Sequence, residues 1–195
     1  CALIECGSQR WLIDAGLTDL TERFAPHSLS GILQTHYHAD HAQGLLHLRW
    51  GQGLIIPVHG PADPEGLADL YKHPGILDFS QPFTAFERRQ LGELSVTALP
   101  LNHSKPTFGY LFEGVLEGGV NRRIAYLTDP LGVPDASAEV LVQQPLDLLV
   151  LPKILALLIA LPLLTVFADV LGVFGGMIMA RAQLGVGFGE FLDRF

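Results

Sequence analysis

The feature that most constrains the fold is the uneven distribution of polar and apolar residues along the chain. Residues 154–180 contain a single charged side chain, Asp169, and are otherwise almost entirely apolar. A helix needs about 20 predominantly apolar residues to span a bilayer, so this run is long enough. Pro162 and the pair at 175–176 (Gly-Gly) would interrupt an ordinary globular helix, but membrane helices tolerate such residues. We therefore expect an apolar, membrane-type helical segment, with a buried pair of core helices as the alternative.

The chain divides near residue 151 on this basis. Residues 1–151 contain all eight histidines and carry the whole net charge of −8, whereas residues 152–195 are neutral overall. We expect the first part to form one domain and the second part to form a hydrophobic helical segment. Each part is expected to be an incomplete piece of a larger protein, joined to the other near residue 151.

Residues 1–151 alternate between short apolar runs of strand type and longer amphipathic runs of helix type. Short runs rich in β-branched and aromatic residues indicate strands, and apolar positions at helical spacing indicate helices. The expected strands are 2–5, 10–14, 31–35, 54–58, 94–101, 108–113, 123–129 and 146–151, and the expected helices are 41–50, 61–73 and 135–144. Strands and helices in this order predict a layered α/β fold.

The composition excludes several classes of protein. Hydrophobic residues make up 49% of the chain and charged residues 16%, which excludes a disordered chain. Only two cysteines, Cys1 and Cys6, are present, so a disulfide scaffold is excluded. We expect both to be small buried side chains of a domain in a reducing, cytoplasmic compartment. The net charge of −8 argues against non-specific nucleic-acid binding.

The segment THYHADH at 35–41 is the strongest chemical signal in the sequence. It follows an expected strand, opens an expected helix, and places four polar side chains within six residues: His36, His38, Asp40 and His41. A turn at a strand end can direct alternate side chains toward one point. Imidazole and carboxylate groups are suitable ligands for zinc, manganese or iron. The spacing predicts that His36 and His38 hold one metal ion, and that Asp40 and His41 face a neighbouring one.

Two further residues extend this metal site. His103 follows the expected strand 94–101, and Asp129 ends the expected strand 123–129. In α/β layers, functional sites gather at the carboxyl ends of strands. A carboxylate such as Asp129 can bridge two cations, and two cations about 3.5–4 Å apart can stabilise a reacting phosphoryl oxygen. We expect two divalent ions, with a solvent-exposed loop position as the alternative for His103.

Three other polar residues have weaker assignments. Asp14, at the end of WLID, is a candidate to orient a ligand histidine, and a turn contact of its own is the alternative. Ser104 and Lys105 follow His103 and are candidates to bind a substrate phosphate. A solvated loop charge is the alternative for Lys105.

The first part of the chain resembles a known family. The pattern HxHxDH after a strand is similar to the metallo-β-lactamase superfamily. THYHADHAQGLLHLRWG, IPVHGPADPEG, DLYKHPGILDF and LPLNHSKPTFGYLFE resemble its phosphoribosyl 1,2-cyclic phosphate phosphodiesterases, which act in phosphonate catabolism. The resemblance covers roughly residues 1–151. It implies an αββα sandwich, a pair of manganese or zinc ions, and hydrolysis of a small phosphorylated sugar, a cyclic ribose phosphate.

The resemblance also implies a role for each ligand. His36, His38 and His103 would bind one ion, Asp40 and His41 would bind the second, and Asp129 would bridge the two. Asp40 is also the expected catalytic residue.

The chain departs from this family in two places. The family has a cysteine-rich, zinc-binding segment before the first strand, and this chain begins after it. The family's last ligand histidine and a catalytic histidine follow the strand that corresponds to LDLLVL, and this sequence has no histidine after His103. Residues 152–195 instead resemble, through PLLT, FADVLG and GG, the membrane permease of a lipid-transporting ABC system.

Three hypotheses about function follow. The first is a metal-dependent phosphodiester hydrolase, impaired or not by the missing histidines. The second is a piece of a lipid-transport permease with a vestigial hydrolase part and membrane contact through 154–180, associated with the inner membrane. The third is a metal-binding module without catalysis.

Overall fold

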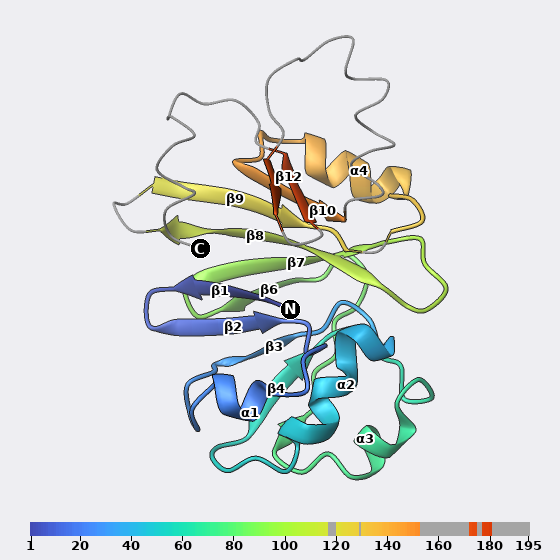
Figure 1. Cartoon of the computed structure of the whole chain (residues 1–195). Coiled ribbons are helices and arrows are strands. Elements are labelled where there is room, and N and C mark those ends of the chain that lie inside the picture. The colour runs from blue at the N-terminus through green and yellow to red at the C-terminus, as the bar shows by residue number, and fades with distance from the viewer. Residues whose placement is uncertain (117–119, 129, 153–171, 175–176, 181–195) are drawn as a thin grey trace.

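The computed structural model describes residues 1–116, 120–128, 130–152, 172–174 and 177–180. These residues form two β-sheets that lie face to face between helices (Figure 1). The first sheet has the order β1-β2-β3-β4-β5, and the second has the order β11-β12-β10-β9-β8-β7-β6. The described helices are α1 (Leu20–Arg23), α2 (Ala39–Leu48), α3 (Ala68–Lys72) and α4 (Asp135–Val142).

The first sheet begins with a hairpin and continues with parallel strands. Antiparallel β1 and β2 are joined by a tight turn, and β2, β3, β4 and β5 then pair in parallel. Parallel neighbours need a crossover, and α1, α2 and α3 lie in the connections between these strands. The strands are β1 (Ala2–Cys6), β2 (Gln9–Ile13), β3 (Gly31–Leu33), β4 (Ile56–His59) and β5 (Leu77–Asp78).

The second sheet is mostly antiparallel. Consecutive strands β6 to β9 pair as a meander, β10 pairs in parallel with β9, and β12 pairs antiparallel with β10 and β11. The strands are β6 (Arg88–Leu91), β7 (Leu94–Pro100), β8 (Phe108–Leu116), β9 (Val120–Tyr126), β10 (Leu148–Pro152), β11 (Gly172–Phe174) and β12 (Met177–Ala180).

Side-chain alternation along the strands builds three cores. Trp11 and Ile13 point between the sheets, where they pack with Tyr110 of β8, while Leu12 between them points to the opposite face. The core between the first sheet and its helices includes Leu12, Ile32, Leu20, Leu45 and Leu70. The core outside the second sheet includes Leu99, Leu111, Ala125, Val140 and Leu141. Because alternate residues of the central strands face different cores, both sheets pack on both sides there, which confirms the layered α/β prediction.

Several element boundaries differ from those expected. Helix α2 begins at Ala39 rather than at 41, so Asp40 lies in its first turn. Helix α3 covers only Ala68–Lys72 of the expected 61–73. Strand β6 was not expected, because its sequence RRQL is charged; it lies at the edge of the second sheet, where charged side chains remain in solvent. A tight turn at Gly92, with φ +61°, joins β6 to β7.

The expected helical segment after residue 151 is only partly described. Residues 153–171, 175–176 and 181–195 of it lie outside the described part of the chain. Residues 172–174 and 177–180 are strands, so the prediction of a helix is wrong for these seven positions. An apolar run by itself is compatible with either a helix or a buried strand, and pairing with β10 favours the strand here. Among the described residues, every helix is too short or too polar to cross a bilayer.

The expected boundary at residue 151 falls inside β10. Residues 148–150 pair with β9, and residues 149–152 pair with β12. The division into domains 1–151 and 152–195 stays a prediction.

A buried arginine joins the second sheet to its covering helix. Arg123 of β9 is 8% exposed, and its guanidinium donates hydrogen bonds to the carbonyls of Val140, Leu141 and Gln144 at the end of α4. It also pairs with Glu113 of β8, with 3.3 Å between Nε and Oε1. The last carbonyls of a helix have no partner within the helix, so this side chain replaces a C-terminal cap.

Replacing Arg123 should therefore destabilise the fold. We expect Arg123→Met to lower the free energy of unfolding by about 2–4 kcal/mol, because it leaves buried carbonyls without donors and removes one of the two arginines that pair with Glu113. Arg122→Met is the matched control, since Arg122 forms a partly exposed pair with Asp147 and should cost less than about 1 kcal/mol. Urea denaturation of both variants measures the difference, and equal losses would contradict the assignment.

Candidate metal centre

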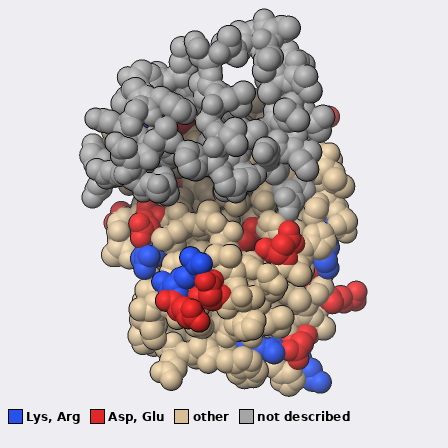
Figure 2. Space-filling model, in the orientation of Figure 1, with Lys and Arg blue, Asp and Glu red and all other residues tan. Residues whose placement is uncertain are grey.

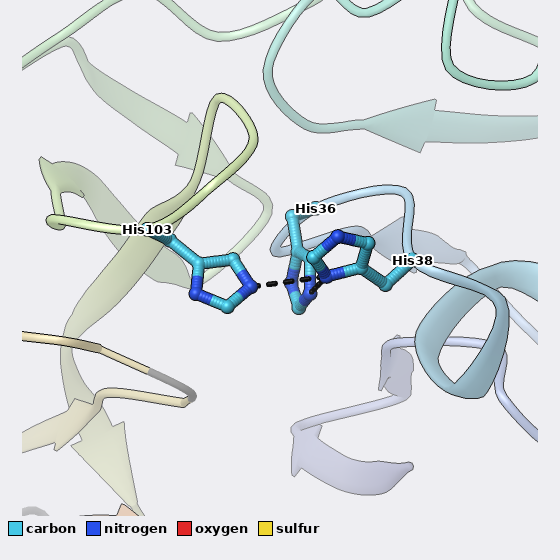
Figure 3. A group of neighbouring side chains, drawn as sticks. All are labelled: His36, His38 and His103. Atoms are coloured by element: carbon cyan, nitrogen blue, oxygen red, sulfur yellow. Dashed lines mark hydrogen bonds between the residues drawn. The ribbon is translucent and has the colours of Figure 1, made fainter.

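The candidate centre lies where the first sheet meets a loop of the second sheet. The chain leaves β3 at Leu33, passes through residues 34–38 outside any helix or strand, and enters α2 at Ala39. This places His36 and His38 on a connection of the first sheet. His103 comes from the connection after β7, on the second sheet. The three imidazoles point toward one another from these two sides (Figure 3).

The ligand atoms of the three histidines form a compact group. The His38 Nδ1 atom lies 3.0 Å from His36 Nε2 and 3.0 Å from His103 Nε2 (dashed lines in Figure 3). All three ligand atoms lie within 4.8 Å of one another. Around a tetrahedral zinc with bonds of ~2.0–2.1 Å, neighbouring nitrogens are about 3.3 Å apart. The spacing therefore fits one metal ion. We call His36, His38 and His103 the histidine triad.

Hydrogen bonds on the outer side of the rings support this fit. The Thr35 hydroxyl lies 2.9 Å from both carboxylate oxygens of Asp14 and 3.0 Å from His36 Nδ1. A carboxylate only accepts, so the hydroxyl hydrogen points to Asp14 and its oxygen accepts from His36 Nδ1–H. The inner Nε2 of His36 then carries a lone pair. Ser104 Oγ lies 3.4 Å from His38 Nε2 and can accept in the same way, which leaves His38 Nδ1 as a lone-pair atom.

The electrostatics around His36 favour the neutral imidazole that a metal needs. His36 has no exposed surface, and burial, followed by the neighbouring His41, His103 and His38, lowers its pKa from 6.5 to about 3. His36 is thus uncharged at neutral pH. The lone pair of His36 Nε2, which lies 3.0 Å from His38 Nδ1, is then available to a metal ion.

The buried Asp14 carboxylate also orients a fourth histidine, His41, through a hydrogen bond. Its carboxylate, 1% exposed, accepts hydrogen bonds from Thr35 N (2.7 Å), from Gln34 Nε2 (3.1 Å) and from His41 Nδ1 (2.7 Å). Asp14 has a φ of +59°, which a residue other than glycine adopts only when its surroundings hold it there. The contact directs His41 Nε2 away from Asp14.

The other side of His41 faces Asp40. His41 Nε2 lies 3.5 Å from Asp40 Oδ2, and the Asp40 side chain is 77% exposed. The His41 ring stacks obliquely on His36, with centroids 4.3 Å apart. Asp40 and His41 therefore lie beside the triad without being part of it. Asp129, the expected bridging ligand, lies outside the described residues.

Two glycines let α2 approach the loop after β2 closely enough to build this site. Gly44 N donates to Ala15 O at 2.7 Å, and a Cβ on Gly44 would lie 2.0 Å from Leu17 O. A Cβ on Gly16 would lie 1.8 Å from Asp40 O. Any larger residue at either position would push the start of α2 away from Asp14.

The remaining candidates lie at the same place. Ser104 contacts His38, as described, and the Lys105 ammonium lies 3.3 Å from Asp63 Oδ2. The sequence analysis did not single out Gln34, Thr35 or Asp63. Gln34 and Thr35 directly follow the apolar strand β3 and are fully buried, which the sequence alone did not indicate.

The fold and the triad define a metal-binding protein of the layered αββα type, and a family model agrees. Residues 9–156 match the model of the beta-lactamase superfamily domain, which is well over half of the chain, so the chain belongs to this superfamily. The superfamily fold and the histidine triad together imply that this site binds a divalent metal ion. Residues 136–195 also match the model of the permease MlaE.

Individual proteins are similar in sequence to parts of this chain. The chain is 39% identical over 82 residues to a hydroxyacylglutathione hydrolase of Marinomonas sp. (strain MWYL1), covering 38% of this chain and 30% of that protein. It is 30% identical over 118 residues to a ribonuclease Z of Methanosarcina acetivorans, covering 55% and 38%. The chain thus spans 30% and 38% of the length of these two relatives.

Solved structures have the same fold. A diphosphatase from the PhnP family has a TM-score of 0.57 at 25% identity, over 75% of this chain and 57% of that one. The metallo-beta-lactamase fold protein YhfI from Bacillus subtilis has a TM-score of 0.55 at 18% identity, over 75% and 60%. The second likeness concerns the fold alone.

The triad makes a direct prediction about metal binding. We expect His103→Ala to weaken zinc binding by about 100-fold or more, because changes outside the ligands alone cost about 10- to 100-fold. His47→Ala is the control, since His47 is an exposed histidine of α2. Zinc titration and elemental analysis after dialysis measure the effect. Unchanged zinc content in His103→Ala would show that the three rings do not share an ion.

Proposed function

We propose that this protein is a metal-dependent phosphodiester hydrolase whose substrate is a small phosphorylated sugar of the cyclic ribose phosphate class. The observation that carries the proposal is the convergence of His36, His38 and His103 from two sheets within 4.8 Å. The likeness to a diphosphatase from the PhnP family, at 25% identity, supports phosphorus chemistry rather than another hydrolysis. Such a substrate would place the reaction in phosphonate catabolism.

The residues fit a site for two manganese or zinc ions. The triad would hold the first ion through Nε2, Nδ1 and Nε2 of its three rings. Asp40 and His41 would hold the second ion, with Asp129 between the two. When bound, such ions supply a hydroxide at neutral pH and withdraw charge from a phosphoryl oxygen.

Asp40 has the position of the catalytic residue in this proposal. Its carboxylate is exposed, yet one oxygen lies 3.5 Å from His41 Nε2, so it reaches both solvent and the site. We expect Asp40 to orient the attacking water and to accept its proton at the carboxylate oxygen. The hydrogen bond from His41 Nδ1 to Asp14 fixes the ring against which Asp40 lies.

The charges of the site and of the whole chain favour a small anionic substrate. The Ser104 hydroxyl lies 3.4 Å from His38 Nε2, and Lys105 is the next residue of the same loop; both side chains can bind a phosphate oxygen. The net charge of −8 disfavours a nucleic-acid substrate, although one relative is named a ribonuclease. In Figure 2, basic and acidic side chains of the described residues alternate on the face shown.

The test of this proposal is metal-dependent cleavage of a model phosphodiester. We expect the zinc- or manganese-loaded chain to hydrolyse bis(p-nitrophenyl) phosphate, and Asp40→Asn to lower kcat by about 100-fold or more, the usual contribution of a general base. Glu22→Gln, an exposed change on α1, is the control and should leave kcat unchanged. Full metal occupancy without turnover would reject the hydrolase and favour a metal-binding module.

A second candidate function is supported by the match of residues 136–195 to the permease MlaE. In that case residues 154–180 would contact the inner membrane and the hydrolase part would be vestigial. The full chain would then stay in the membrane fraction after an alkaline carbonate wash, because a spanning helix is not released by high pH. Release of the whole chain into the wash would exclude a spanning segment.

A further inference from the structure

A carboxylate outside the triad lies beside the residue proposed to bind the substrate anion. Asp63 belongs to the connection after β4, on the first sheet, and Lys105 belongs to the connection after β7, on the second sheet. The Lys105 Nζ atom lies 3.3 Å from Asp63 Oδ2. The two side chains are 28% and 12% exposed, so this ion pair is partly screened from water. It joins the same two sheets as the triad.

Asp63 is the fixed partner of the pair. The backbone N–H of Gly66 donates both to Asp63 O at 3.1 Å and to Asp63 Oδ1 at 3.0 Å, which closes a turn around the carboxylate. The N–H of Asp63 donates to the Tyr71 hydroxyl at 3.4 Å. A Cβ at Gly66 would lie 2.1 Å from Asp63 Oδ2, so only glycine leaves room for this arrangement.

Lys105 is the partner that can move. Its carbonyl accepts a hydrogen bond from the Thr107 hydroxyl at 2.9 Å, which fixes the backbone, while the ammonium sits on a flexible four-carbon stem. Lys105 follows His103 by two positions, and its charge is one of the influences that lower the pKa of His36. Ser104, which lies between His103 and Lys105 in the sequence, is 3.4 Å from His38 Nε2, so the loop that carries Lys105 lies against the triad.

We propose that Asp63 is a positioning residue that competes with the substrate anion for the Lys105 ammonium. Without an anion, Asp63 holds the ammonium at the side of the triad. An anion that binds at the triad must take the Lys105 ammonium from Asp63. Asp63 therefore lowers the affinity of the site for anions, and only an anion that attracts the ammonium more strongly than Asp63 does is retained. The inference rests on the proposed function for the position of the anion, and it extends that function to the control of substrate affinity.

Phosphate binding tests this competition without measuring turnover. Isothermal titration of the full, zinc-loaded chain with inorganic phosphate would compare Asp63→Asn, Lys105→Met and the double variant with the unmodified chain. We expect Asp63→Asn to tighten phosphate binding by about two- to fivefold, the worth of one partly exposed ion pair. Lys105→Met should weaken it by about tenfold or more, since it removes a charge-assisted hydrogen bond. In the double variant, the gain from Asp63→Asn should disappear.

Two features keep the test specific. Asn retains the side-chain oxygen that accepts from Gly66 N, so Asp63→Asn preserves the turn while removing the charge. Asp78→Asn is the matched control, because Asp78 Oδ1 accepts from Ser80 N at 2.9 Å in a similar turn at the end of β5. It removes the same charge and should leave phosphate affinity unchanged.

Several outcomes would overturn the inference. These are unchanged or weaker phosphate binding in Asp63→Asn, an equal gain in Asp78→Asn, a gain that persists without Lys105, or no phosphate binding by any variant. The proposed hydrolase fails by a different result, the absence of metal-dependent phosphodiester cleavage. A chain that binds phosphate with this pattern but cleaves nothing would uphold the competition between Asp63 and the anion and reject the reaction.

Discussion

The arrangement of the site depends on the buried carboxylate of Asp14. Burying a carboxylate is unfavourable unless hydrogen bonds replace its water, and here it receives them from Gln34, Thr35 and His41. These donors belong to the loop after β3 and to the first turn of α2, so one side chain at the end of β2 holds three segments in register. The Thr35 hydroxyl then sets the ring nitrogen that His36 presents. The orientation of the His36 and His41 rings thus follows from satisfying one buried carboxylate.

Much of the fold could be predicted because it follows from local patterns. The alternation of Trp11, Leu12 and Ile13 between two cores is visible in the sequence as a continuous apolar run, typical of a strand covered on both faces. Strand β6 was missed because edge strands need no apolar face. Residues 172–174 and 177–180 were misassigned because an apolar run does not distinguish a buried strand from a helix, and the pairing with β10 is not a local property.

Some residues of the candidate site could likewise be predicted from the sequence, and others could not. His36 and His38 were predictable because two histidines separated by a single residue, directly after a buried strand, are rarely needed for packing alone. His103 was a weaker prediction, since its place beside them depends on how the two sheets pack. The partners that orient these rings, Thr35 among them, could not be predicted, because a polar residue at a strand end is ordinarily exposed. Their burial results from a contact with Asp14 that spans 21 residues.

One consequence of the triad concerns the topology of the chain. His38 and His103 are separated by 65 positions, and the segment between them runs from α2 of the first sheet to β7 of the second. A cation that joins them acts as a cross-link that closes this long loop, as a disulfide would, and so reduces the number of conformations open to the unfolded chain. Stability and ligand chemistry would then be linked, because the ion would join two sheets that also share an apolar core and polar contacts such as the Lys105–Asp63 ion pair.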